Sequence, residues 1–126
     1  NISVGKNFYT NHNVTILDGA KVTFGDYVFI APNCVFSTAG HAIDSEQRCK
    51  GMEIALPITV GDHVWIGTNV SVLPGVTIGS DTIIGAGSVV NKDIPSGVIA
   101  AGNPCRVIRR ITEADKHKYP VFEDAR

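Results

Sequence analysis

Several scarce features narrow the class of this chain before any motif is considered. Charged residues make up 18% of the 126 residues and the formal net charge is −1. This balance excludes a general electrostatic footprint for nucleic acid or for an anionic membrane surface. Apolar runs are short, and none reaches the ~18 residues that a transmembrane helix needs. Aromatic residues make up only 7% while glycine occurs 13 times, which favours narrow turns around a slim core.

Cysteine is also scarce, and its spacing bears on the cellular compartment. Cys34, Cys49 and Cys105 are odd in number, and no two of them form a CxxC pair. That pattern argues against a disulfide scaffold or a zinc knuckle and fits the reducing cytoplasm. No charged segment followed by an apolar stretch opens the chain, so we expect no signal peptide and a cytoplasmic location. Because the chain starts within a pattern and without methionine, we expect it to be a fragment.

What the chain has in abundance is a six-residue repeat. From Val60 it reads VGDHVW, IGTNVS, VLPGVT, IGSDTI, IGAGSV and VNKDIP. Each hexad opens with Val or Ile, the second residue is usually Gly, and the fifth is Val, Thr, Ser or Ile. The same register fits 24–41 and, with two extra residues, 4–23. Such repeats predict a solenoid, in which each coil buries its inward side chains by stacking on its neighbours.

We therefore predict an all-β fold, a parallel β-helix with three short strands in each coil. The first residue of each hexad should point to the axis and the fifth should lie beside it, with Gly, Asn or Asp in the corners. Cys34 occupies a fifth position and is read as structural. A sandwich of short strands is the alternative, which nine or more hexads in phase argue against. About four coils are expected, at 4–23, 24–41, 60–77 and 78–95.

Two segments fall outside the repeat. Residues 42–59 interrupt it, and we expect a loop extruded from the prism, because such a loop cannot bury its own backbone polar groups. After Pro95 the hexads end, which divides the chain into a β-helix at 1–95 and a C-terminal cap at 96–126. The cap should contain a short strand and then a short helix from Thr112, and should cover the open end of the prism.

With these features placed, the chain resembles the maltose/galactoside O-acetyltransferases of the hexapeptide acyltransferase superfamily. The segments that carry the resemblance are NFYTNHNVTILD, IAPN, the GH at 40–41, PITVGDHVWIG, PGVTIG, IGAGSVVNKDIP and AGNPCRVIR. The resemblance implies a left-handed helix, a homotrimer with active sites between neighbouring prisms, and acetyl-CoA as donor, with no metal required. It implies no nucleic-acid or membrane partner. The helical segment that precedes the repeats in that family has no counterpart here, which leaves the acceptor least determined.

One histidine stands out as a general base. A sugar hydroxyl is a poor nucleophile at neutral pH, so its direct attack on a thioester needs a base, and neutral imidazole suits that task. His41 ends its hexad where the chain leaves the prism, and with the resemblance we predict that it is this base. The alternative is a solvated loop histidine. His12 and His63 lie at corner positions and His117 lies in the charged tail, so they are weaker candidates.

The resemblance also assigns residues to the acceptor. Asn11 and Asp18 occupy the coil below His41, where relatives contact the reacting hydroxyl and the sugar. Gly19 departs from relatives that carry a second acidic residue there. Glu53 matches a loop position that borders the acceptor. The alternatives are corner turns for Asn11 and Asp18 and an exposed loop acid for Glu53.

The donor needs a channel, an oxyanion site and cations. Trp65 should form a wall of the thioester or pantetheine channel, or else pack between prisms. The backbone NH of Thr68 is our candidate for stabilising the oxyanion, since a fixed amide needs no reorganisation. Backbone amides near Gly67, Ala86 and Ser88 should bond the pantetheine arm. The phosphates need cations, and the candidates, which otherwise form a solvated basic face, are Lys92, Arg106, Arg109 and Arg110.

Three rival functions remain open at this stage. The same acetyl-CoA chemistry could act on an antibiotic, on serine or on a surface oligosaccharide. A γ-class carbonic anhydrase shares the prism but needs three metal-binding histidines at matched positions, and no H-x4-H occurs here. A non-catalytic scaffold is the third, and His41, Trp65 and the basic tail argue against it.

Overall fold

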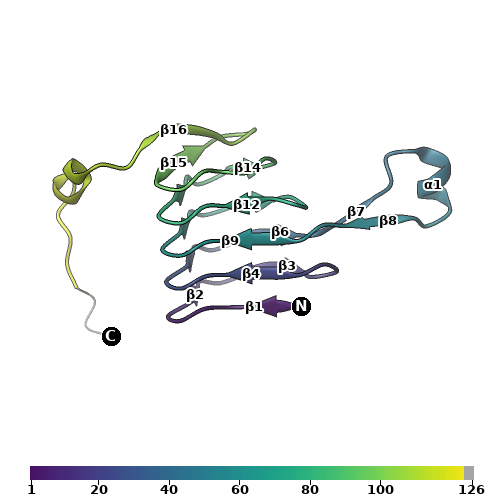
Figure 1. Ribbon diagram of the computed structural model, residues 1–126, viewed down its shortest axis with the longest axis horizontal. Helices are drawn as coiled ribbons and strands as arrows, with labels where there is room; N and C mark the ends of the chain where they lie inside the picture. Colours follow the sequence, from purple (N-terminus) through teal and green to yellow (C-terminus); the bar gives the residue numbers. More distant parts are fainter. Residues whose placement is uncertain (124–126) are drawn as a thin grey trace.

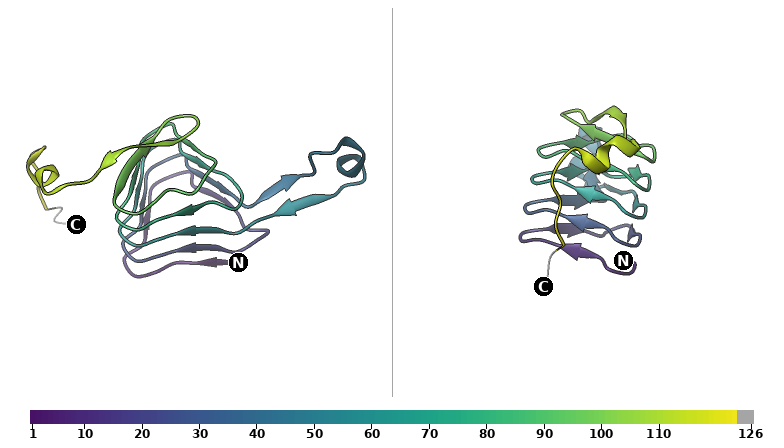
Figure 2. Two further views of the ribbon diagram at one scale, coloured as in Figure 1. Left: turned by 45° about the horizontal axis from the view of Figure 1, so that its top comes forward. Right: turned by 90° about the vertical axis from the view of Figure 1, so that its left-hand side faces the viewer.

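The hexads form short strands that stack in parallel on three sheets. A computed structural model of the chain describes residues 1–123. The chain passes through sheets A, B and C in turn and returns to sheet A one coil higher (Figures 1 and 2). Trp65, for example, pairs in parallel with Phe29 on one side and Ile83 on the other. The all-β prediction is confirmed, and this cyclic order is that of a parallel β-helix.

The strands of each sheet come from successive coils. Sheet A contains β1 (Ile2–Ser3), β4 (Val22–Phe24), β9 (Ile58–Val60) and β12 (Thr77–Ile78). Sheet C contains β3 (Thr15–Leu17), β6 (Val35–Ser37), β11 (Ser71–Val72) and β14 (Val89–Val90). Sheet B contains β2 (Tyr9–Thr10), β5 (Phe29–Ile30), β10 (Trp65–Ile66), β13 (Ile83–Ile84), β15 (Val98–Ala101) and β16 (Arg106–Arg110).

The core confirms the predicted inward positions. The opening residues Val60, Ile66 and Val72 are almost completely buried, and so are the fifth-position residues beside them. Cys34 is buried, and its Sγ lies 3.1 Å from the carbonyl oxygen of Gly67, which fits a structural role. The buried fifth-position residues in the second half of the repeat are Val64, Val70, Val76, Thr82, Ser88 and Ile94.

The preference for glycine at the second hexad position has a steric explanation. The third residue of the next coil bonds back to this corner: Asp62 Oδ1 accepts from Asp26 NH at 2.7 Å, and Ser80 Oγ accepts from Asp62 NH at 2.9 Å. A Cβ added at Gly61 would lie 2.7 Å from the backbone nitrogen of Ser80 and would also overlap its hydroxyl. The glycine therefore lets neighbouring coils approach at the normal strand spacing.

This contact predicts a stability effect. We expect Gly61→Ala to lower the free energy of unfolding by about 1–3 kcal/mol, because the methyl group has no space and the backbone above must move. Chemical denaturation followed by circular dichroism measures the change. Gly19→Ala is a matched control, because its Cβ would lie 3.8 Å from Ala55 Cβ and from Thr38 Oγ1, which is ordinary contact. Equal stabilities of the two variants would contradict the steric explanation.

The strand ladder continues beyond the last recognisable hexad. Ile94, within the last hexad, bridges to Ile78 on sheet A, and beyond that hexad β15 pairs in parallel with β13 on sheet B. The pairing of Ile83 with Ile99 has a spacing of 16 residues, whereas Trp65 with Ile83 has 18, so this last coil is two residues shorter. The missing residues hide the hexad pattern from the sequence although the pairing persists.

The interruption in the repeat is an antiparallel hairpin that projects from the corner between sheets C and A (Figures 1 and 2). Its strands are β7 (Ala39–His41) and β8 (Glu53–Ala55), so the excursion begins three residues earlier than predicted and includes His41. The helix α1 (Ser45–Cys49) lies at the tip, where the Asp44 side chain accepts from Gln47 NH at 2.9 Å.

The C-terminal segment follows a different path from the predicted one. Strand β16 folds back antiparallel on β15, and the 3₁₀ helix η1 (Glu113–His117) begins after Thr112, as predicted. Helix η1 does not cross the open end of the prism; it stands out beside sheet B (Figures 1 and 2). A cavity of about 340 Å³ separates this tail from the sheet, with Trp65 and Ile99 on one side and Tyr119 on the other. Strands β15 and β16 of the predicted cap lie at the upper end of the prism, whereas helix η1 takes no part in covering it (Figure 1). No helix among residues 1–123 is long and apolar enough to cross a membrane.

Candidate active site

One group of predicted residues gathers where sheet B turns into sheet C, which we call the B/C edge. Asn11, Gly67, Thr68 and Ala86 lie in turns of this edge, after β2, β10 and β13, and the turn after β5 separates Asn11 from the others. Trp65 lies just before the turn, on the outer face of sheet B. Asn11 and Trp65 line the same cavity, of about 160 Å³. Arg106 joins the upper end of the edge, because it pairs with Ala101 at the end of β15.

The backbone of the B/C edge offers free hydrogen-bond donors. Gly67 NH donates to Ile84 O at 2.8 Å, and a Cβ at Gly67 would lie 2.8 Å from the nitrogen of Ala86, so the coils meet closely here. The carbonyl of Thr68 accepts from Gly87 NH. Neither Thr68 NH nor Ala86 NH donates to any acceptor within residues 1–123. A ligand that lies along this edge would therefore meet fixed, unused amides.

A second group gathers at the hairpin, on the corner between sheets C and A, which we call the C/A edge. His41 pairs directly with Glu53 across the hairpin. The flanking pairs, 42 with 52 and 38 with 56, are joined by backbone hydrogen bonds, so positions 41 and 53 form a non-hydrogen-bonded pair. Side chains approach most closely in such pairs. Both side chains are exposed, and together they present an imidazole and a carboxylate to whatever lies against the hairpin.

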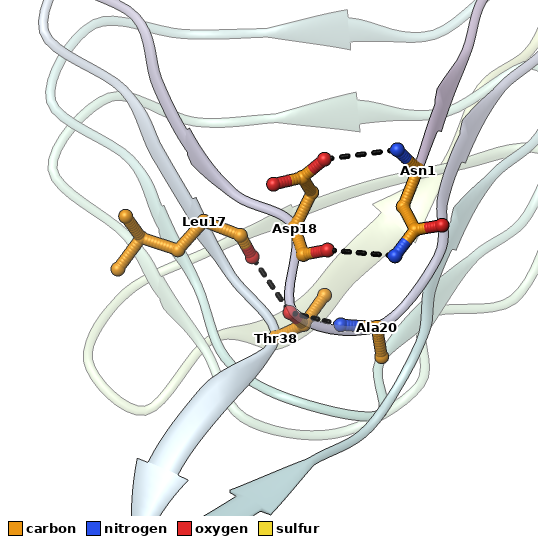
Figure 3. Close-up of polar contacts among 5 residues, drawn as sticks. All are labelled: Asn1, Leu17, Asp18, Ala20 and Thr38. Atoms are coloured by element: carbon orange, nitrogen blue, oxygen red, sulfur yellow. Dashed lines mark hydrogen bonds and ion pairs between the residues drawn. The ribbon is translucent and has the colours of Figure 1, made fainter.

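The root of the hairpin is fixed to the coil beneath it (Figure 3). Thr38 is completely buried. Its Oγ1 donates to Leu17 O at 2.6 Å and accepts from Ala20 NH at 3.0 Å. These bonds hold the turn that carries Asp18 against the base of the hairpin. The side-chain amide of Asn1 also donates to the carbonyl oxygen of Asp18 at 3.0 Å. The C/A edge thus carries the Asp18 carboxyl group in the coil below His41.

The two groups lie on different edges of one prism. The hairpin leaves between β6 of sheet C and β9 of sheet A, whereas Trp65 lies on sheet B. Lys92, which follows β14 of sheet C, is also on the side of the hairpin. The body of the prism separates His41 from Trp65 within a chain. Within one chain the predicted site residues therefore form two separate groups, and we call each group a half-site.

Two predicted donor residues are already engaged inside the chain. Ser88 is completely buried, and its hydroxyl donates to Gly85 O at 2.6 Å and accepts from Gly102 NH at 3.0 Å. Arg109 forms a bidentate ion pair with Asp115, at 2.7 and 2.9 Å, and so anchors helix η1. Arg106, Arg110 and Lys92 are exposed. The roles assigned to all these residues in binding the coenzyme stay predictions.

The Arg109–Asp115 pair predicts a pH effect on the tail. Hydrogen bonds from the Arg109 guanidinium hold the pKa of the Asp115 carboxyl well below its ordinary value of 3.8. A lowered folded-state pKa means that the pair stabilises the tail above pH ~4 and that this contribution is lost as the pH falls further. We expect Asp115→Asn to speed hydrogen exchange of the 112–118 amides at pH 7, with the difference from the unchanged protein shrinking toward pH 2. A difference that is independent of pH would contradict this role.

Sequence reasoning missed an aromatic ladder beside Trp65. Tyr9, Phe29 and Trp65 occupy the same register on the outer face of sheet B, and each side chain is about half exposed. Tyr9 and Phe29 also line the cavity that holds Asn11. The sequence contains a signal for this ladder, because all three aromatic residues are the sixth residue of their hexads in successive coils. The pattern is visible only when the hexads are aligned.

Comparisons with known proteins agree with this architecture. The model of the bacterial transferase hexapeptide (six repeats) matches residues 57–92. The galactoside O-acetyltransferase of Escherichia coli is 56% identical over 124 residues, which are 98% of this chain and 60% of that protein. A putative acetyltransferase of Saccharomyces cerevisiae is 64% identical over 115 residues, 91% of this chain and 59% of that protein.

Solved structures give the same result. A galactoside acetyltransferase in complex with coenzyme A superposes with a TM-score of 0.91 and 54% identity, over 98% of this chain and 60% of that chain. A maltose O-acetyltransferase from Clostridium difficile 630 gives 0.87 and 51%, over 89% of this chain and 60% of that chain. The chain thus spans about three fifths of the length of these relatives. It contains a bacterial transferase hexapeptide domain, with the galactoside and maltose O-acetyltransferases among its close homologues.

Proposed function

We propose that this protein is an acetyl-CoA-dependent O-acetyltransferase that acetylates a sugar hydroxyl of the maltose, galactoside or glucoside type. The observation that carries the proposal is the match of 98% of the chain, at 54% identity, to a galactoside acetyltransferase that binds coenzyme A. We also infer a left-handed β-helix of about four coils and a cytoplasmic protein, as the resemblance implies. No metal takes part in the proposed chemistry.

One proton must move as the acetyl group passes from the sulfur of the thioester to the oxygen of the acceptor. His41 accepts the proton of the acceptor hydroxyl while that oxygen attacks the thioester carbon. The NH of Thr68 donates to the oxyanion that forms. The C–S bond then breaks, and the imidazolium of His41 returns the proton to the leaving thiolate. The products are the acetyl ester and the free thiol of coenzyme A.

Because each chain carries two separated half-sites, we propose that a complete active site forms only between two copies of the chain. His41 and Trp65 lie on different edges of one prism, so we propose that the C/A edge of one chain faces the B/C edge of the next. A heterologous contact of this kind closes into a ring when the rotation suits, and a homotrimer is the ring that we propose. The exposed apolar side chains of the hairpin, which would cover the cleft, are Ile43, Met52, Ile54 and Leu56.

Acceptor and donor then lie between the two edges. Asn11 from the B/C edge and Asp18 and Glu53 from the C/A edge supply polar groups for the acceptor sugar. Trp65 forms the wall of the thioester channel, and the backbone near Gly67, Ala86 and Ser88 carries the pantetheine arm. The cations proposed for the phosphates are Lys92, Arg106 and Arg109, of which Arg109 also holds Asp115.

Thiol release from acetyl-CoA tests this function. The assay compares galactosides, glucosides and maltose with serine and chloramphenicol as acceptors. Release with a sugar supports the proposal, whereas release only with serine or chloramphenicol keeps the chemistry and changes the acceptor. Failure to bind acetyl-CoA in calorimetry would reject the transferase assignment and leave a scaffold.

A further inference from the structure

The turn directly below the hairpin is longer than the equivalent turn above it. Ile16 and Val72 share one register on sheet C, and Thr23 and Thr77 share one register on sheet A. The chain takes seven positions from Ile16 to Thr23 but only five from Val72 to Thr77, so the turn below holds two extra residues. We call residues 18–21 the lower turn. The extra residues enlarge the C/A edge beneath the point where the hairpin leaves the prism.

The lower turn is fixed to the root of the hairpin (Figure 3). The hydroxyl of Thr38 bonds to Leu17 O before the turn and to Ala20 NH within it. Position 19 lies between these two anchors. Its place relative to the hairpin is therefore set by the fold.

Gly19 has neither of the two usual structural reasons for a glycine. Of the 13 glycines, all within residues 1–123, five have a positive φ, and at seven others an added Cβ would lie 3.1 Å or less from another atom. Apart from its chain neighbours, a Cβ at Gly19 would meet only Ala55 Cβ and Thr38 Oγ1, both at 3.8 Å. Glycine loses more conformational freedom on folding than any other residue. Since neither backbone nor packing requires it here, we look for a use of the space that its missing side chain leaves.

That space lies on the face of the hairpin that carries His41. The contact with Gly19 shows that Ala55 faces the lower turn, and side chains two residues apart on a strand share a face, so Glu53 points the same way. His41 lies directly opposite Glu53 and shares its face. Leu56, the next residue along, faces the turn above instead, because its Cβ would lie 3.4 Å from a Cβ added in that turn.

The spacing along the hairpin sets what reaches Gly19. Ala55 and Glu53 are two residues apart, which is about 7 Å along a strand. A sugar whose reacting hydroxyl is held by His41 has its ring beside Glu53, and a sugar ring fills a distance of this size. A substituent on the opposite side of the ring then enters the space over Gly19.

We propose that Gly19 is a specificity-determining residue, whose missing side chain admits an acceptor with a second sugar beyond the ring that reacts. The proposal rests on the proposed function and names its acceptor class, a disaccharide or longer glycoside. Asp18, directly before Gly19, keeps 44% of its side chain exposed. Its carboxyl oxygens can accept hydrogen bonds from the hydroxyls of the second sugar.

A larger side chain at this position tests the proposal. Gly19→Leu is compared with the unchanged protein on a monosaccharide and on the disaccharide that extends it, glucose with maltose and galactose with lactose. The quantity measured is the ratio of kcat/KM for the disaccharide to kcat/KM for the monosaccharide. Damage to the fold or to the assembly lowers both rates alike and leaves this ratio unchanged. Thr15→Leu is the matched control, because Thr15 is also exposed and lies on β3, the strand that leads into the lower turn, but on the outer face of sheet C.

We expect Gly19→Leu to lower the ratio by about 10-fold or more, the discrimination that a few methylene groups provide in a binding site. Thr15→Leu should leave the ratio as it is. An equal ratio in Gly19→Leu and the unchanged protein, or an unchanged protein that acetylates only monosaccharides, would overturn the role of Gly19 and leave the proposed function intact. Failure of every sugar as an acceptor would overturn the proposed function and this inference with it.

A smaller substitution separates a steric effect from a structural one. Gly19→Ala adds one methyl group with two ordinary contacts, so the melting temperature should not fall. We expect an intermediate loss with the disaccharide, seen as a higher KM for that sugar while the affinity for acetyl-CoA in calorimetry stays the same. A loss that appears in acetyl-CoA affinity, or one that does not grow from Gly19→Ala to Gly19→Leu, would contradict the proposal.

Discussion

Replacing His41 by alanine should lower acceptor-dependent thiol release from acetyl-CoA by about 100-fold or more, the size typical of general-base loss. His41 is exposed on strand β7, and it makes no side-chain hydrogen bond within residues 1–123. The substitution therefore removes an imidazole without removing a structural contact. Steady-state rates with the best acceptor of the panel, at saturating acetyl-CoA, measure the effect.

The loss should be confined to the rate of transfer. The melting temperature, the trimer mass and acetyl-CoA affinity should match those of the unchanged protein. His117→Ala is the control, because that histidine is also exposed but does not line the cavities that contain Trp65. A His41→Ala protein with more than about half of the original rate would remove this residue from the role of base.

Mixing two inactive variants should restore activity. His41→Ala keeps an intact B/C edge, and Trp65→Ala keeps an intact C/A edge, so a mixed trimer contains some contacts in which both halves are native. With random assembly from equal amounts, about one quarter of the contacts are of this kind, so about one quarter of the original activity should return. The two purified proteins are unfolded together, refolded and assayed.

The matched control is the double variant that carries both substitutions in one chain. Mixed with the unchanged protein in the same way, it tests whether refolding itself alters the rate. Recovery in the mixture of single variants requires that His41 and Trp65 act from different chains. If that mixture stays as inactive as its parents while sedimentation shows mixed trimers, each site lies within one chain and the proposed arrangement is wrong.

The β-helix was predictable because its physical cause repeats. Each coil needs an apolar residue toward the axis and a small or β-branched one beside it, and buried residues such as Val60 and Val64 stand at these predicted positions. The corners were predictable for the same reason, since Asn69 and Gly75 follow the turn rule. Because the hexad pattern occurs many times, the fold can be predicted even where a single hexad departs from it.

The parts that occur once were not predictable in the same way. The register that sets His41 opposite Glu53 depends on the length of the hairpin, and the hexad repeat contains no information about that length. The path of the tail depends on the ion pair between Arg109 and Asp115, six residues apart, and such a pair cannot be distinguished from a phosphate site by charge alone. That the site residues lie on two different edges could be recognised only once the register of the coils was known.

The hairpin is a self-contained insertion, and this has a consequence for evolution and engineering. Its strands β7 and β8 pair with each other, and the prism ladder resumes at Ile58, whose NH donates to Lys21 O at 3.0 Å. The hairpin can therefore be exchanged as a cassette between Thr38 and Ile58 while the scaffold keeps its folding determinants. A library confined to this cassette, with His41 kept, would vary the surface proposed to meet the acceptor with little loss of foldable sequences.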